Sequence, residues 1–281
     1  MSGYLRQARY LLAENPITLA AFVMLFVIVA AAVAGPSLAP YDPLKTSVLD
    51  ALQPPSAAYW FGTDKLGRDV FSRVLIATRL DLMIAIGAVA LSFVFGTLLG
   101  ALAGYLGGWV DRVVGGVVDT VMAFPLFVLA MGIVAAIGYT VENIVYATAI
   151  INLPFYARMA RAEVNVRRNA GYVEAARMSG NSRARILLVH LIPNVLPPLM
   201  VQISLNMGWA ILNAAGLSFI GLGIRPPTAE WGIMVAEGAS FIISGEWWVA
   251  FFPGVALTLT VLCFNLLGDG LREIVDPRRR T

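Results

Sequence analysis

The chain has 281 residues, of which 59% are hydrophobic and 13% are charged, and its formal net charge is +3. Soluble domains carry about 45–50% apolar and about 25% charged residues, so this composition excludes a soluble globule with a large core. The small, dispersed positive charge argues against nucleic-acid binding. A single cysteine, Cys263, excludes an intramolecular disulfide and a cysteine metal cluster.

In chain order, six apolar segments are predicted to cross a membrane as helices: about 17–36, 82–106, 114–138, 139–159, 196–218 and 248–268. A bilayer core requires about 20 apolar residues per helix, and the segments lack the alternation of a barrel strand. The first segment is too long for the apolar part of a signal peptide and is interpreted as a retained anchor. The fourth is the weakest, because only fifteen residues separate Glu142 from Arg158. The predicted fold is an all-α, polytopic membrane protein with six transmembrane helices.

The distribution of basic residues orients these helices. With the N-terminus in the cytoplasm, 14 of the 20 Lys and Arg residues fall on the cytoplasmic side, among them Arg6, Arg9, Arg278, Arg279 and Arg280. The positive-inside rule therefore places both termini in the cytoplasm. The largest cytoplasmic segment then lies between the fourth and fifth spans.

Two outer segments flank the predicted spans. Residues 61–79 are predicted to form an interfacial helix, with Arg68, Arg73 and Arg79 largely on the side opposite its apolar residues. Residues 221–247 form the second outer surface, where the tryptophans are also explained by simple anchoring at the membrane interface.

Three glycines in the second span, Gly96, Gly100 and Gly104, recur at every fourth residue and share one helix face. This spacing predicts close helix packing rather than substrate contact, and a smooth glycine face would also let helices shift. Asp119 is an acidic group in or near the membrane. We expect it to be held structurally by arginines or by neighbouring backbone, because a proton relay requires further ionisable partners.

The stretch YVEAARMSGNSRARILLVHLIPN, residues 172–194, is polar and rich in arginine within an otherwise apolar chain. Good helix formers precede Gly180, which is predicted to end a short helix in the left-handed conformation. Ser182 or Asn181 can cap a second helix, and Pro193, Pro197 and Pro198 are expected to interrupt or kink the approach to the fifth span. Two alanines leave room for a partner, and Glu174 can pair with Arg177 or reach across to that partner. An amphipathic surface helix with snorkelling arginines is the alternative.

This stretch resembles the EAA loop of binding-protein-dependent ABC importers, in which the matching positions are Glu174, Ala175, Ala176, Gly180, Ile192 and Pro193. His190 departs from the general pattern, and HLIPN resembles the peptide-importer branch. Further stretches resemble the second permease subunit of dipeptide and oligopeptide importers: FGTDKLGRDVFSR, DTVMAFP, LSFIGLGIRPPTAEWG, WWVAFFPG and FNLLGDGLREIVDPR.

The resemblance implies a type I importer permease fold in the bacterial inner membrane. Residues 1–80 would form the tail, first span and outer loop, and residues 81–281 a five-helix core with its coupling loop at about 161–195. It also implies a second, homologous permease subunit, two cytoplasmic ATPases and an extracytoplasmic binding protein. The residues implied to couple to the ATPases are Tyr172, Glu174, Ala175, Ala176, Arg177, Gly180 and Pro193.

The sequence holds no phosphate-binding G-x-x-x-x-G-K-[ST] loop, and no cofactor, metal or catalytic site is predicted in this chain. ATP and magnesium are expected on the partner ATPases. His190 has no nucleophile or metal partner in sequence, so a hydrogen-bonding role is expected. The alternatives are an importer of nickel chelates, glutathione, haem or oligosaccharides, a proton-driven secondary transporter, and a membrane scaffold.

Overall fold

The computed structural model describes residues 16–275, and this part of the chain is helical, with one isolated bridge between Thr63 and Asp69 but no strand. The all-α prediction is confirmed. The elements are α2 (Pro16–Leu38), η1 (Val48–Asp50), α3 (Val70–Leu106), α4 (Gly108–Ala123), α5 (Leu126–Ile137), α6 (Val141–Arg167), α7 (Gly171–Met178), α8 (Arg183–Arg185), η2 (Ile186–Leu191), α9 (Ile192–Phe219), α10 (Trp231–Ala239) and α11 (Trp248–Val275).

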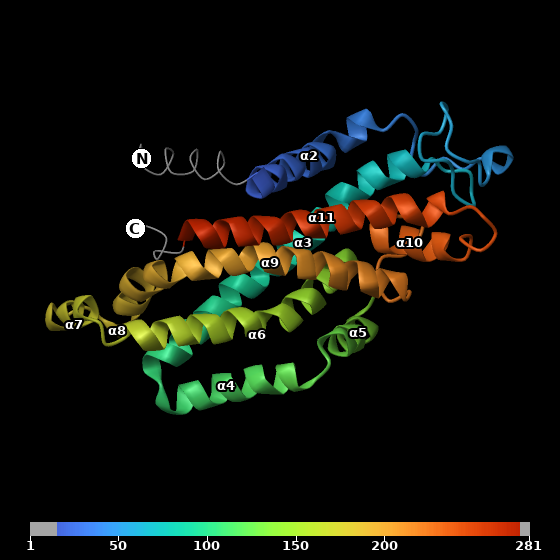
Figure 1. The fold of residues 1–281 in the computed structure, drawn as a ribbon. Helices are drawn as coiled ribbons and strands as arrows, with labels where there is room; N and C mark the ends of the chain where they lie inside the picture. Colours follow the sequence, from blue (N-terminus) through green and yellow to red (C-terminus); the bar gives the residue numbers. More distant parts are fainter. Residues whose placement is uncertain (1–15, 276–281) are drawn as a thin grey trace.

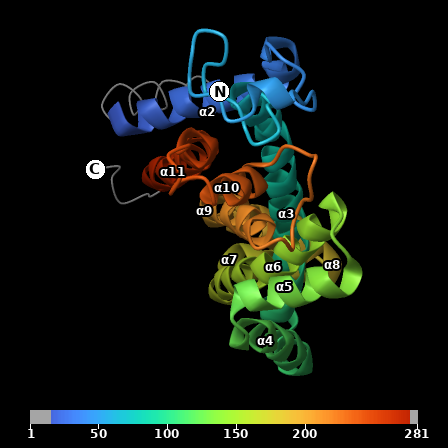
Figure 2. The same ribbon diagram turned by 90° about the vertical axis from the view of Figure 1, so that its right-hand side faces the viewer.

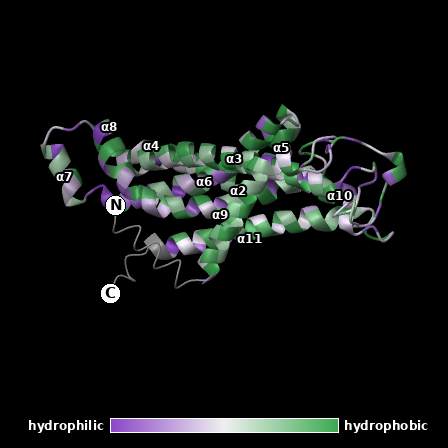
Figure 3. Ribbon diagram, turned by 90° about the horizontal axis from the view of Figure 1, so that it is seen from above, coloured by the Kyte–Doolittle hydropathy of each residue, from purple (hydrophilic) through white to green (hydrophobic). Residues whose placement is uncertain are grey.

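Helices α3, α6, α9 and α11 form a bundle, with α2 on one side of it and α4 on the other (Figures 1 and 2). The start of α2, the end of α11, and α7 with α8 lie at one end of the bundle. Residues 39–69 and α10 lie at the other end. Hydrophobic residues cover the middle and hydrophilic residues gather at both ends (Figure 3). This arrangement agrees with the predicted orientation; the terminal arginines used for it, Arg6, Arg9 and Arg278–Arg280, lie outside the described residues.

Within residues 16–275, four helical runs are long and apolar enough to cross a membrane: Pro16–Leu38, Val70–Leu106, Arg183–Phe219 and Trp248–Arg272. The predicted third span, 114–138, is not one helix, because α4 and α5 meet at an angle of 94°. Pro125 lies at the break, and Phe124 before it is extended with φ −82° and ψ 146°. A proline lacks the amide hydrogen that would continue the helix and disfavours helical geometry in the residue before it.

Helix α6 is longer and more polar than the fourth predicted span, 139–159. It begins where the Asn143 amide donates to the Thr140 side chain, and it continues for 27 residues to Arg167. Its length is about 40 Å at 1.5 Å per residue, so it can cross a bilayer core and still extend beyond it. Its charged cytoplasmic end explains why it falls outside the set of apolar runs.

Helix α3 begins at Val70 rather than near residue 82, so the predicted interfacial helix at 61–79 is wrong. The Asp69 carboxylate caps the helix by accepting a hydrogen bond of 2.8 Å from the Ser72 amide. Residues 61–69 before it form turns. The division drawn after residue 80 therefore falls inside a continuous helix of 37 residues.

Gly96, Gly100 and Gly104 place α3 directly against α6. A methyl group on Gly96 would lie 2.7 Å from the Leu153 carbonyl oxygen, and one on Gly104 would lie 2.7 Å from that of Arg161. At Gly100 a methyl group would overlap the Ala157 carbonyl group. Each glycine thus faces main chain that has no flexible end to move away, and the three together fix the distance between the two helices.

Candidate functional site

The cytoplasmic end of the bundle carries a short helix, α7, whose ends are defined by local hydrogen bonds. Gly180 has φ +77°, a conformation that favours glycine. The Asn181 amide donates to the Ala176 oxygen and the Gly180 amide to the Arg177 oxygen, at 3.2 and 3.0 Å. This pair of bonds is the Schellman motif, which satisfies carbonyl groups at a helix end. The predicted stop at Gly180 is therefore where the helix ends.

Helix α7 has one face in the core and one open face. Val173 and Ala176 are buried, whereas Glu174 and Ala175 are exposed. Because buried positions three residues apart share a helix face, Ala176 faces inward, and only one of the two alanines leaves room for a partner. Met178 is 90% exposed, so the open face of α7 also carries an apolar side chain.

Glu174 and Arg177 do not pair with each other. Glu174 has no ion pair among the described residues. Arg177 instead turns back to the bundle, where it donates to the Arg168 carbonyl oxygen at 3.2 Å and lies over the Tyr105 ring, 5.8 Å from its centre. Glu174 therefore remains available to a partner, while Arg177 fixes α7 to the ends of α3 and α6.

The inner face of α7 belongs to the main hydrophobic core. Val173 packs in one cluster with Val164 of α6, Ile186 and Leu191 of η2, and Val195 of α9. These four helical segments are joined by close-packed side chains, which deform little. A displacement of α7 would therefore be transmitted to both α6 and α9.

The connection from α8 to α9 is helical throughout, so of the two effects predicted for the prolines, an interruption or a kink, the interruption does not occur. Ser182 caps α8 by accepting from the Arg185 amide at 3.3 Å, as predicted. Residues 186–191 form a π-helical turn immediately before Pro193, and Pro197 and Pro198 lie inside α9. His190 lies in this turn rather than in a loop, and its carbonyl oxygen accepts from the Asn194 side chain at 2.7 Å.

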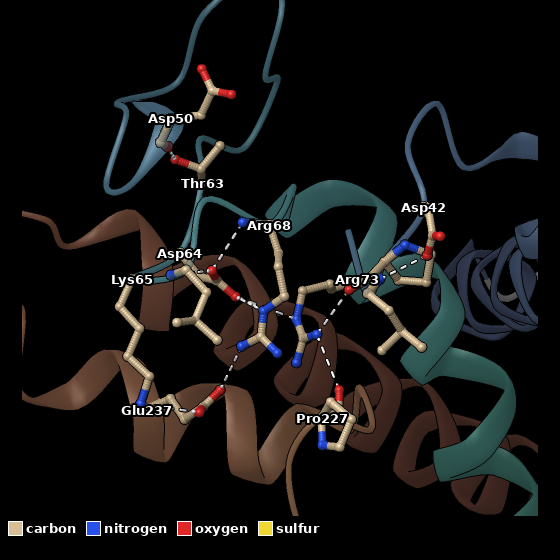
Figure 4. A network of polar contacts seen from close by, with 12 residues as sticks. Asp42, Asp50, Thr63, Asp64, Lys65, Arg68, Arg73, Pro227 and Glu237 are labelled. Atoms are coloured by element: carbon tan, nitrogen blue, oxygen red, sulfur yellow. Dashed lines mark hydrogen bonds and ion pairs between the residues drawn. The ribbon is translucent and has the colours of Figure 1, made fainter. Parts of the chain in front are cut away.

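At the opposite end of the bundle, a network of charged side chains, of which Lys65 is partly exposed and the others are largely buried, joins the outer loop to α10 (Figure 4). The Arg68 guanidinium donates to the Asp64 carboxylate at 2.6 Å and to that of Glu237 at 3.3 Å. Lys65 pairs with the same Glu237 at 3.2 Å. Arg73 donates to main-chain carbonyl oxygens, including that of Pro227 at 3.3 Å. The network thus connects segments far apart in the sequence.

The prediction that Arg68 and Arg73 lie on an exposed face is wrong, because each is only 1% exposed. A buried arginine requires acidic or carbonyl partners, and two of the partners here, Glu237 and the Pro227 carbonyl, come from a much later part of the chain. One local signal could have indicated burial: Asp64 lies four residues before Arg68, and its carboxylate also accepts from the Leu66 amide. That pattern is typical of a closed turn, not of an open helix face.

Two further buried carboxylates, those of Glu230 and Asp81, hold α10 in place. The Glu230 carboxylate caps α10 by accepting from the Gly232 and Ile233 amides, both at 2.8 Å. The Trp231 amide donates to the Asp81 carboxylate of α3 at 3.1 Å. Burial raises the pKa of Glu230, and the two amide hydrogen bonds oppose this shift. The contact between Asp81 and Trp231 was not predicted from the sequence, because 150 residues separate the two.

Asp119 is held by an arginine, as expected: its carboxylate lies 2.6 Å from the Arg158 guanidinium, and both side chains are exposed. A second ion pair between the same helices joins Asp111 and Arg161. The pairs tie α4 to α6 near the cytoplasmic end. No group of three or more His, Cys, Asp or Glu side chains that could hold a metal ion occurs within residues 16–275.

Residues 96–281 match the family model described as binding-protein-dependent transport system inner membrane component, and residues 3–55 match the N-terminal TM domain of oligopeptide transport permease C. The chain is 43% identical to the probable D,D-dipeptide transport system permease protein DdpC of Escherichia coli, over 96% of this chain and 90% of that protein. It is 39% identical to the dipeptide transport system permease protein DppC of Alkalihalophilus pseudofirmus, over 98% and 90%.

The glutathione transport system permease protein GsiD of Pectobacterium atrosepticum is 41% identical, over 94% of this chain and 88% of that protein. Among solved structures, the MetNI methionine ABC transporter in inward-facing conformations superimposes with a TM-score of 0.58 at 17% identity. The match covers 73% of this chain and 96% of that chain. At this identity the likeness concerns the fold alone.

Proposed function

This chain belongs to the family of binding-protein-dependent transport system inner membrane components, and on that premise we propose that it passes short peptides across the cytoplasmic membrane as a permease subunit of an ATP-driven importer. As an ABC transporter permease it works in a complex with other subunits. We assign it a homologous second permease subunit, two cytoplasmic ATPases and an extracytoplasmic binding protein. ATP and magnesium bind to the ATPases, and this chain contributes no catalytic site.

The difference between the two faces of α7 is the observation that supports the coupling role. Its outer face presents Glu174, which has no ion pair within residues 16–275, and the exposed Met178, so a partner protein can reach both side chains. Its inner face is locked into the core between α6 and α9. A ligand shifts a conformational equilibrium only through contacts that differ between the states. An ATPase that grips α7 and moves on binding ATP would supply such contacts.

Substitutions in α7 test this role. In Glu174→Lys the charge offered to the partner is reversed, and in Gly180→Pro the ring cannot adopt φ +77° and the amide donor to Arg177 is lost. Both variants are expected to stay in the membrane while ATP hydrolysis continues without peptide uptake. Gly180→Asn is the matched control, because asparagine tolerates the left-handed conformation and should retain uptake. Wild-type uptake by both uncoupling variants would contradict the proposal.

Glutathione is the second candidate substrate, since permeases named for glutathione are as similar to this chain as those named for dipeptides. Glutathione itself contains peptide bonds, so the two candidates belong to one chemical class. Competition between labelled dipeptide and unlabelled glutathione for uptake by the assembled complex would separate them.

A further inference from the structure

A cavity of about 520 Å³ opens between α6, α9, α11 and the break between α4 and α5. Its polar lining consists of carboxamide side chains contributed by three helices: Asn152 of α6, Gln202, Asn206 and Asn213 of α9, and Asn265 of α11. The other residues that line it are apolar or aromatic, and none carries a charge. The cavity therefore combines hydrogen-bonding groups with an uncharged surface.

This face is unsuited to lipid. A carboxamide without a hydrogen-bond partner is unfavourable in hydrocarbon, and lipid chains offer it none. Five such groups around one hollow therefore indicate contact with water, a polar ligand or another protein. In a permease, the space that is filled first by water and then by a polar substrate is the translocation pathway.

The amides retain free hydrogen-bonding capacity among the described residues. Asn152 and Asn213 each use one donor, at 2.9 Å, on a carbonyl oxygen of their own helix. Gln202 donates to the Asn206 side-chain oxygen at 3.0 Å. Asn206 is only 3% exposed, and its side chain also interacts with the buried Tyr156 hydroxyl. Since an amide side chain has two donors and an acceptor oxygen, these contacts leave both kinds of group for a ligand.

We propose that this amide-lined cavity binds the main chain of the peptide as it crosses the membrane. The inference rests on the proposed function. A carboxamide presents the same N–H and C=O groups as a peptide bond, so it can pair with any peptide regardless of its side chains. Phe155 and Trp209 supply aromatic surface for those side chains. Because the lining is uncharged, neither acidic nor basic residues of the peptide are held tightly or repelled.

The test uses the complete complex with its binding protein, reconstituted in vesicles and saturated with loaded binding protein so that capture does not limit uptake. Asn206→Leu and Asn213→Leu keep the branched shape of the side chain but remove the hydrogen bonds. Thr258→Val is the matched control: it removes an exposed hydroxyl of α11 whose hydrogen bond stays within that helix, outside the cavity. The substrates are a dipeptide and the same dipeptide methylated on its peptide nitrogen.

In the wild type and in Thr258→Val, methylation is expected to slow uptake about three- to tenfold, the effect of losing about one hydrogen bond. The two leucine variants should import the ordinary dipeptide more slowly by a similar factor and lose this sensitivity to methylation. If they import both peptides as the wild type does, the inference is overturned while the proposed function stands. If the wild-type complex imports no peptide, the proposed function itself fails.

A second measurement separates a pathway from a subunit interface. Asn213→Cys in the assembled complex is expected to react with a water-soluble maleimide, and peptide transport should slow the reaction. The natural Cys263 is buried, so the wild type provides the background. If Cys at position 213 is unreactive and instead crosslinks to the second permease subunit, the cavity is a packing surface and the proposal is wrong.

Discussion

At the scale of single residues, Arg68 connects the outer loop to α10, because its one guanidinium binds two carboxylates of the network in Figure 4. Arg68→Met would remove the buried guanidinium that pairs with the Asp64 and Glu237 carboxylates. Removing one member of a buried ion pair costs about 3–5 kcal/mol. We expect a loss of that order in the free energy of unfolding, measured on the purified complex in detergent.

Lys65→Met is the matched control, since Lys65 pairs with the same Glu237 but its side chain is 42% exposed. Exposed ion pairs contribute about 0–1 kcal/mol. A loss of stability in Lys65→Met equal to that in Arg68→Met would show that burial of the network is not what stabilises the outer end.

Glu230 gives the outer end a dependence on pH. Because burial raises its pKa in the folded protein, the folded state binds a proton more tightly than the unfolded chain. Its contribution to stability is therefore full below the ordinary pKa of glutamate and declines as pH rises through the raised value. Hydrogen exchange of α10 should accordingly quicken as pH increases, after correction for intrinsic exchange rates.

Glu230→Gln isolates this effect. A glutamine has one acceptor oxygen for the two amides of Gly232 and Ile233, so the variant is expected to be less stable throughout. It cannot ionise, and the dependence of α10 exchange on pH should become shallower. If the pH dependence of α10 exchange is unchanged in Glu230→Gln, a titratable group other than Glu230 causes it.

At the scale of helices, the contact between α3 and α6 depends on the absence of side chains on one face. Gly100→Ala would press a methyl group into the Ala157 main chain, and overpacking of this kind costs about 1–3 kcal/mol. We expect lower thermal stability and less assembled complex in size-exclusion chromatography, with a larger effect for Gly100→Leu.

Gly115→Ala is the control for this substitution, because apart from the adjacent backbone of its own helix no atom of residues 16–275 lies within 4 Å of the position its methyl group would take. Alanine favours a helix over glycine by about 1 kcal/mol. The control should therefore be as stable as the wild type or slightly more stable. Similar losses in both variants would mean that the glycines act through the backbone and not through packing.

At the scale of the whole molecule, the cytoplasmic and outer ends are joined by long, closely packed helices. Helix α3 has 37 residues, or about 55 Å at 1.5 Å per residue, and connects the charge network at its start to Tyr105 beneath α7 at its end. The same helix is fixed to α6 by its glycines. A movement of α7 can therefore be transmitted to the outer end through the packed helices α3 and α6.

The orientation itself can be tested with single cysteines. Met178→Cys on α7 should be labelled only from the cytoplasmic side, in inverted vesicles stripped of ATPases, and should be protected when the ATPases are added back. Val48→Cys in the outer loop, at a position 91% exposed, should be labelled only from outside. Labelling of both from one side would contradict the orientation, and lack of protection at position 178 would contradict the coupling role.

Features that depend only on neighbouring residues could be predicted from the amino-acid order. Helical hydrogen bonds are local, so an apolar run in a membrane must be a helix wherever it packs. The stop at Gly180 and the cap at Ser182 are likewise encoded within a few residues. The distribution of arginines gave the orientation for the same reason, because it depends on position along the chain alone.

The faces by which these helices meet depend on the complete fold and could not be predicted in this way. Glu237, the partner that permits Arg68 to be buried, lies 169 residues away, and the inward turn of Ala176 follows from the core that α6, η2 and α9 build beneath it. The cavity amides come from three helices whose contacts no local pattern encodes. Packing and desolvation act between residues that only the complete fold brings together. Patterns of neighbouring residues therefore do not predict these contacts.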